Sequence, residues 1–159
     1  MKKLALILLL SGSGHFVFAQ KPDKLTSFRL GLEGGVSPNV GTTQYFNLGL
    51  TARYSLHAGP GYAYVGTGYM VSREGINFQI PIRVGYKFIF STQFFIQEDF
   101  GYYFFKDPES YAGQTVLHGL SIATSAGLQL GIFDIGIQYD AIINQNNFST
   151  IGFMLGWNF

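Results

Sequence analysis

The sequence contains no cysteine. A chain without cysteine cannot form a disulfide framework, a cysteine-based metal or redox site, or the acylated cysteine of a lipoprotein. Charged residues are also scarce, at 12% of the 159 residues, which is about half of the roughly 25% usual in soluble domains. A soluble domain of this size has a large surface to hydrate, so the low charge content argues against one.

Long apolar runs are missing as well. The run from Leu4 to Leu10 is the clearest, and it is far shorter than the roughly 20 residues that a spanning helix needs. The formal net charge is +1, without the clustered basic patch that a nucleic-acid partner requires. A closed β-barrel is the other structure that satisfies its backbone inside a bilayer.

The N-terminus has the features of a secretory signal peptide. Lys2 and Lys3 precede the apolar run, and small residues lead to Ala19, with cleavage expected before Gln20. The alternative is a membrane anchor, for which the run is too short. We therefore assign residues 1–19 to a signal peptide, 20–26 to a short periplasmic tail and 27–159 to the barrel.

The last nine residues alternate with a period of two. This period predicts a β-strand, because successive side chains point to opposite faces. A soluble barrel of the lipocalin kind would turn the large apolar face inward, and a membrane barrel would turn it to lipid. The face consists of Ile151, Phe153, Leu155, Trp157 and Phe159.

Seven further segments complete a predicted eight-stranded, antiparallel, up-and-down transmembrane β-barrel. An even number of strands places both ends of the barrel on the same side of the membrane. If that side is the periplasm, the short turns lie there and the longer connections lie outside. We expect the first outer connection at 37–44 and the last at 142–149. The predicted strands are 27–36, 45–56, 61–71, 76–90, 93–105, 116–130, 132–141 and the C-terminal strand.

The apolar pattern assigns the strand charges to the lumen. A base facing lipid near the midplane costs about 2–4 kcal/mol, and a one-residue slip would expose the whole set. We expect the opposite charges to pair and to fill a narrow lumen; the alternative is a narrow solute pore. The predicted lumen cluster, with a structural role, is Arg29, Glu33, Arg53, Arg83, Lys87, Asp99, Asp134 and Asp140.

Glu98 is the exception, because it adjoins Asp99 and strict alternation forces one of the two outward. We predict a β-bulge near residues 97–100 that lets both carboxylates face the lumen.

The segment Phe78 to Phe88 resembles the central motif of the outer-membrane protein β-barrel domain family, which includes small OmpX-like and PorT-like barrels. Gln79 stands where an acid is usual, and Ile82 where leucine is common. The resemblance implies an outer-membrane barrel whose last strand is read by the barrel-assembly machinery. In this chain that signal would be Phe153, Leu155, Trp157 and Phe159.

Catalytic features are weak. A lipid-modifying enzyme at the outer rim would need a histidine, a serine and an acid together, but His118 and Ser121 are three apart on a strand and so face opposite sides. We assign no catalytic, cofactor-binding or metal residue. We expect the interfacial aromatic girdles to draw on Tyr45, Tyr54, Tyr62, Tyr102, Tyr103 and Trp157.

These observations predict a non-enzymatic outer-membrane protein with a structural, surface-interaction or secretion-accessory role. The alternatives are a lipid-modifying enzyme at the rim and a narrow solute pore. Expected partners are outer-membrane lipid, the barrel-assembly machinery and an unknown surface or periplasmic protein. Such a protein would bind the connections at 106–115 and 142–149.

Overall fold

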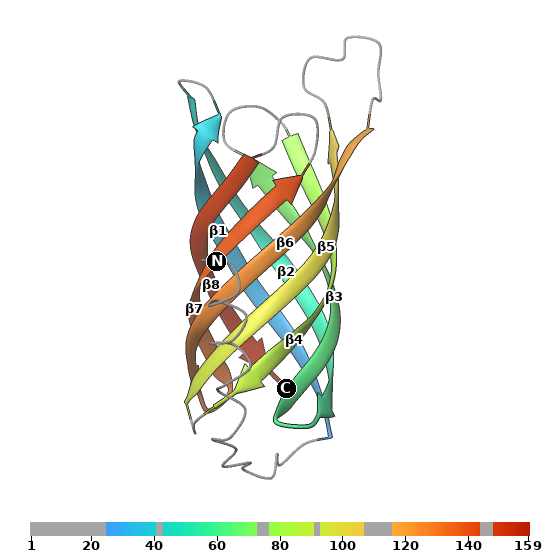
Figure 1. Ribbon diagram of the computed structural model, residues 1–159, viewed down its shortest axis with the longest axis vertical. Helices are drawn as coiled ribbons and strands as arrows, with labels where there is room; N and C mark the ends of the chain where they lie inside the picture. Colours follow the sequence, from blue (N-terminus) through green and yellow to red (C-terminus); the bar gives the residue numbers. More distant parts are fainter. Residues whose placement is uncertain (1–24, 41–42, 73–76, 91–92, 107–115, 144–147) are drawn as a thin grey trace, which may run out of the picture.

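The computed structural model describes residues 25–40, 43–72, 77–90, 93–106, 116–143 and 148–159. Eight strands run up and down around one axis (Figure 1). They are β1 (Thr26–Val40), β2 (Thr43–Ala58), β3 (Gly61–Ser72), β4 (Asn77–Ile89), β5 (Phe94–Lys106), β6 (Val116–Leu130), β7 (Phe133–Ile143) and β8 (Phe148–Asn158).

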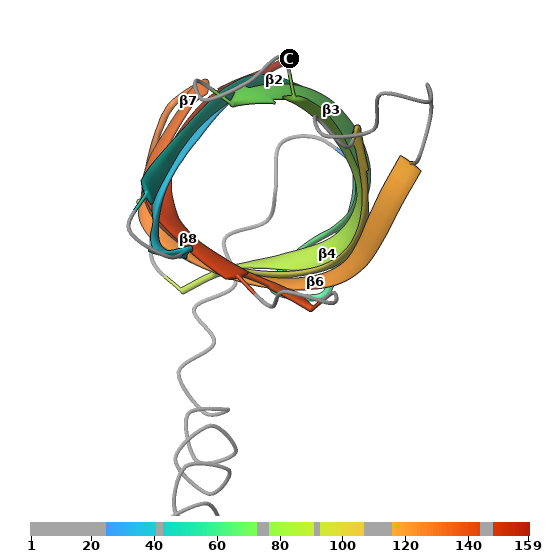
Figure 2. The ribbon, with the colours of Figure 1, turned by 90° about the horizontal axis from the view of Figure 1, so that it is seen from above.

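The sheet is closed. Each strand pairs antiparallel with the next, and β8 pairs with β1, which confirms the predicted eight-stranded barrel (Figure 2). Following paired residues once around the wall from Thr26 returns to β1 at Val36, a shear of 10 residues (36 − 26). This stagger tilts the strands, as closure of a barrel requires. No helix in the described part of the chain has the length and apolarity that a membrane crossing demands.

The two faces of the wall differ as the alternation predicts. Large apolar side chains such as Leu50 and Ile137 are exposed on the outside. Polar and charged side chains are buried inside. This arrangement is the reverse of a soluble barrel, whose apolar face is turned inward, and it suits a wall surrounded by lipid.

Aromatic side chains form two belts on the outer wall. On β5, Phe94 lies near the rim where β1 begins and β8 ends, hereafter the lower rim, and Phe104 lies ten residues further along. Ten residues of a strand that rises about 3.3 Å per residue and tilts by about 40° cover about 25 Å, the height of an apolar membrane band. The lower belt includes the contacts Phe90–Phe94, Phe133–Trp157 and Trp157–Phe159, and the upper belt Tyr69–Phe78 and Tyr102–Phe104.

Two connections at the lower rim are tight turns. Gly59 and Gly131 adopt positive φ angles of 61° and 64°, a conformation that side chains with a Cβ adopt only under strain. Gly59 follows β2 and Gly131 follows β6. These two turns of the lower rim are therefore built on glycine.

The strands at the upper rim are longer than predicted. The connection expected at 37–44 is reduced to residues 41–42, because Ser37 pairs with Tyr45 and Val40 pairs with Thr43. β7 continues to Ile143, with Ile142 buried inside, and β8 begins at Phe148. Those parts of the predicted outer connections belong to the barrel wall.

The predicted bulge at residues 97–100 is wrong. Glu98 pairs with Tyr86 on one side and Thr124 on the other, in a register that runs without a shift along both edges of β5. Its side chain is exposed on the outer face, while that of Asp99 is buried. A bulge would have to break two ladders at once, so β5 keeps its alternation and leaves one carboxylate outside.

Candidate functional site in the charged lumen

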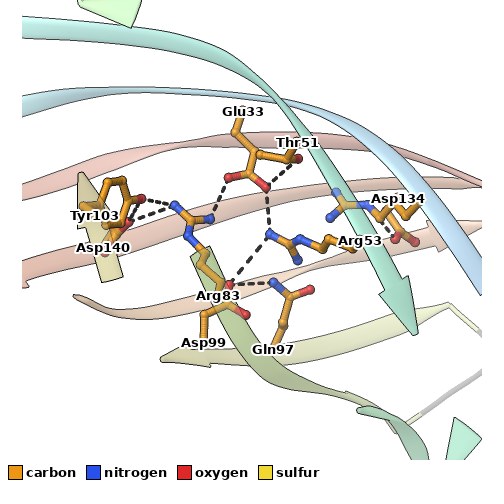
Figure 3. Close-up of polar contacts among 10 residues, drawn as sticks. Glu33, Thr51, Arg53, Arg83, Gln97, Asp99, Tyr103, Asp134 and Asp140 are labelled. Atoms are coloured by element: carbon orange, nitrogen blue, oxygen red, sulfur yellow. Dashed lines mark hydrogen bonds and ion pairs between the residues drawn. The ribbon is translucent and has the colours of Figure 1, made fainter. Parts of the chain in front are cut away.

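The barrel encloses a dense network of charged side chains (Figure 3). The structure places all eight residues of the predicted lumen cluster on the inner face, each buried. Six ion pairs link them. Charges buried in such a setting are tolerated only when they are paired and hydrogen-bonded.

Glu33 on β1 is the centre of the upper network. Its Oε1 accepts hydrogen bonds from Arg53 Nη2 at 2.7 Å and Thr51 Oγ1 at 3.1 Å, and its Oε2 accepts one from Arg83 Nη1 at 2.8 Å. Both carboxylate oxygens are thus used, and two guanidinium groups are held by one acid. Figure 3 shows these groups converging from β1, β2 and β4.

Arg83 extends this network across the lumen. Its Nη2 donates to Asp140 Oδ2 on β7 at 3.0 Å and also to the Tyr103 hydroxyl on β5. The Tyr103 hydroxyl in turn donates to Asp140 Oδ2 at 2.6 Å, and the Arg83 guanidinium carbon lies 5.3 Å from the Tyr103 ring centroid. Through Glu33, Arg83 and Asp140, the non-adjacent strands β1, β4 and β7 are therefore tied together across the interior.

A second group lies nearer the lower rim. Lys87 Nζ donates to Asp134 Oδ1 at 2.8 Å and to Gln129 Oε1 at 2.9 Å, and it lies 4.4 Å from the centroid of the Phe95 ring. Arg29 Nε lies 3.4 Å from Asp134 Oδ2. Asp134 therefore serves two cations.

Asp99 is a second acid beside Arg53. Its Oδ2 lies 3.7 Å from Arg53 Nη2 and accepts a hydrogen bond from Gln97 Nε2 at 3.1 Å. Arg53 itself stands directly opposite Arg29 in the β1–β2 ladder, an arrangement of like charges that destabilises a sheet. The acids supplied by β1, β5 and β7 offset that repulsion.

The side chains close the lumen. Asp99 and Met154 have an exposure of 0%, and Phe95 and Tyr103 one of 1%, although all four face the barrel axis. A water-filled channel past them would leave these side chains exposed. A cavity of about 20 Å³ lies above, beside Glu33, Asp140 and Gln138, with room for about one water molecule.

The upper rim does not bring the two candidate catalytic residues together. His118 is exposed outside, where its ring stacks on Tyr102 at 5.5 Å between centroids, and Ser121 is buried inside. Within the part of the chain that the structure describes, no group of three or more acidic or histidine residues could hold a metal ion.

Several members of the network were missed from the sequence. Tyr103 was expected in an aromatic girdle, but it is buried inside, on the same face as Asp99 four residues earlier. That even spacing is the signal that would have found it. Thr51, whose inward side the alternation of the second strand already predicts, and Gln97 share the inner face in the same way and are also buried.

The C-terminal strand presents the four residues of the predicted assembly signal on its outer face. The ring of Trp157 stacks on that of Phe159 at 5.5 Å. The Phe159 amide donates to the Phe28 carbonyl at 2.8 Å, which fastens the end of the chain to β1. Phe153 and Leu155 are exposed higher on the same face.

The fold is that of known small outer-membrane barrels. The N-terminal β-barrel domain of Pseudomonas aeruginosa OprF is similar over 84% of this chain and 97% of that domain, with a TM-score of 0.59 and 10% identity. Yersinia pestis Ail, the attachment invasion locus protein, is similar over 84% of this chain and 97% of its own, with a TM-score of 0.55 and 12% identity. The outer membrane enzyme PagL is similar over 81% of this chain and 98% of its own, with a TM-score of 0.53 and 15% identity. No family model and no curated protein matches the sequence.

An apolar outer wall, a charged and closed interior and this fold together define an integral outer-membrane β-barrel protein. The resemblance to small OmpX-like barrels is confirmed at the level of the fold. The same fold carries proteins that are not enzymes and one that is, so the specific role has to be argued from the site.

Proposed function

We propose that this protein is a non-enzymatic membrane scaffold, whose closed barrel presents its outer connections to a partner at the cell surface or in a secretion assembly. The observation that carries the proposal is the filled lumen. Its charges are bound to one another across β1, β2, β4 and β7, an arrangement that stiffens the wall and leaves no path for a solute. The eight lumen charges then have a structural role.

The comparison with Ail supports a surface-contact role, since the name of that protein describes attachment and invasion. In such a barrel the binding residues lie on the connections, because loops carried by a rigid scaffold commonly hold functional residues. The longest connection in this chain follows β5, at residues 107–115, which lie outside the described residues. That segment is our first candidate for the partner site.

Export and assembly complete the proposal. We infer that residues 1–19 direct secretion and are removed, that residues 20–26 form a short periplasmic tail, and that the lower rim faces the periplasm. The outward Phe153, Leu155, Trp157 and Phe159 would serve the barrel-assembly machinery. Support for this role comes from their position on the strand that closes the barrel against β1.

The test is a cross-linking pull-down from intact outer membranes. We expect the wild-type protein to capture a partner that is lost when residues 107–115 are replaced by a glycine-serine linker. A variant with residues 73–76 replaced is the matched control, since it alters another connection on the same rim that is not a predicted partner site. Capture of the same proteins by all three forms would overturn the role of the first segment.

A rim enzyme of the PagL kind is the second candidate, favoured by the fold and by the exposed His118. The opposed directions of His118 and Ser121 count against it. Unchanged lipid A acyl content in cells carrying His118→Ala supports the scaffold, and an altered acyl content would favour the enzyme.

A further inference from the structure

Glu98 occupies an unusual place in the barrel wall. It lies on the outer face of β5, four residues above Phe94 of the lower belt and six below Phe104 of the upper belt. It is therefore within the apolar band. Among the aspartate, glutamate, lysine and arginine side chains that the structure describes, it is the one on the outer face; the others are buried inside.

One neighbour partly satisfies this carboxylate. Thr124 Oγ1, directly opposite on β6, donates a hydrogen bond to Glu98 Oε2 at 2.8 Å. An ionised carboxylate accepts about four hydrogen bonds, and lipid chains donate none. The remaining capacity of Glu98 therefore points outward, away from the protein's own groups.

The side of Glu98 that faces β6 allows another wall to approach closely, while Tyr86 lies directly opposite Glu98 on β4. Thr124 and Ala126 stand beside it on β6, facing Glu98 and Ile96 respectively, and both are exposed. Small residues next to a polar group are the pattern by which membrane-embedded surfaces associate. No lysine or arginine side chain accompanies them on the described outer face, so the patch offers one carboxyl group and one hydroxyl group.

We propose that the patch formed by Glu98, Thr124 and Ala126 is a docking surface for a second copy of this chain. Two copies inserted in the same direction are related by a two-fold axis along the membrane normal, and such an axis brings equal heights of the same patch together. The patch is self-complementary because its acceptor and its donor are adjacent.

The hydrogen bonds between the two copies follow from this symmetry. A two-fold axis that passes between Glu98 and Thr124 sets the Glu98 carboxylate of each copy opposite the Thr124 hydroxyl of the other. Each Thr124 hydroxyl donates to the Glu98 of its own or of the partner's wall. No covalent bond forms or breaks, and no further reactant is needed.

The absence of cysteine makes the test direct, because an introduced cysteine is the sole thiol in the chain. Ala126→Cys places it on the patch, and Ala52→Cys places a matched one on the outer side of β2, four strands away around the wall. Each variant is oxidised in native outer membranes and analysed by non-reducing electrophoresis. Folding is checked by the mobility of the unheated barrel.

We expect disulfide-linked dimers from Ala126→Cys and none from Ala52→Cys. Adding Glu98→Leu should weaken association about tenfold, as the loss of two membrane-embedded hydrogen bonds implies. Adding Glu98→Gln should retain most of the dimer, since an amide both donates and accepts. Equal cross-linking at both positions, cross-linking that Glu98→Leu leaves unchanged, or a product with a different protein would each overturn the proposal.

Discussion

The inner and outer faces of the wall treat neighbouring carboxylates in opposite ways. Asp99 is fully buried, with Arg53 and Gln97 as partners. Glu98, one residue earlier, faces outward with the hydroxyl of Thr124. Two adjacent residues of β5 thus differ sharply: Asp99 is bound to partners in the lumen, and Glu98 faces lipid, which cannot solvate its charge. The wall is rigid enough to impose its alternation on an unfavourable residue.

The comparison extends to the whole network. Inside, four bases and four acids balance, and each is bound to groups on other strands. Outside, cohesion depends on the apolar surface and the aromatic belts. Changes inside should therefore act on stability through lost partners and packing, while changes outside should act through transfer to lipid.

The largest effect is expected at Glu33. Glu33→Leu leaves Arg53 and Arg83 without their shared acceptor, so the free energy of unfolding should fall by about 3–5 kcal/mol. Urea unfolding in lipid vesicles, followed by the fluorescence of the single Trp157, measures this fall. Glu33→Gln is the control and should lose less, because its amide oxygen still accepts. A loss of under about 1 kcal/mol for leucine would show that the network is not structural.

A methyl group added inside should cost more than one added outside. A Cβ on Gly156 would overlap the Arg29 guanidinium, so Gly156→Ala should lower the free energy of unfolding by about 1–3 kcal/mol through overpacking. A Cβ on Gly34 would meet the side chains of Leu48 and Phe153, which can turn into lipid. The same unfolding assay compares the two variants, and a larger loss for Gly34→Ala would contradict the packed lumen.

The two neighbouring carboxylates should respond with opposite signs. In dilute detergent, where copies are separated, Glu98→Leu should raise the free energy of unfolding by about 1 kcal/mol, since a lipid-facing acid costs less than the 2–4 kcal/mol of a base. Asp99→Leu should lower it, because Arg53 loses a partner. Loss of stability in both variants would mean that the hydrogen bond from Thr124 stabilises the barrel by more than the outward Glu98 carboxylate costs.

The fold could be predicted because the two faces of each strand differ so strongly. Apolar residues at every second position define the side of Arg29, Arg83 and Asp140 without knowledge of any pairing. Which charges meet could not be predicted in the same way. The contact of Arg83 with Asp140 joins β4 to β7 across the lumen, and that geometry depends on closure and on the shear of the whole barrel.

Two local predictions, the turn after Ser37 and the bulge at Glu98, were wrong for a similar reason. Ser37 and the proline that follows it suggest a turn, yet the β1–β2 ladder continues to Val40 with a register shift after Ser37, a place where proline is tolerated. At Glu98, the cost of one charge in lipid suggested a bulge, but the ladders on both edges of β5 outweigh it. Local preference lost to strand pairing in both cases.

The smallest expected effect concerns ion conduction. A closed lumen inside an apolar wall should conduct no ions. If Tyr103 and Phe95 seal the lumen as their 1% exposure indicates, purified wild-type protein in a planar bilayer should show no steady current. An open porin in the same bilayer controls for insertion and detection. Tyr103→Ala should also stay silent, because the Phe95 layer is intact below it, beside Lys87. A steady wild-type current would mean that the charged network lines a path, and the interior would then have to be reinterpreted as a solute channel.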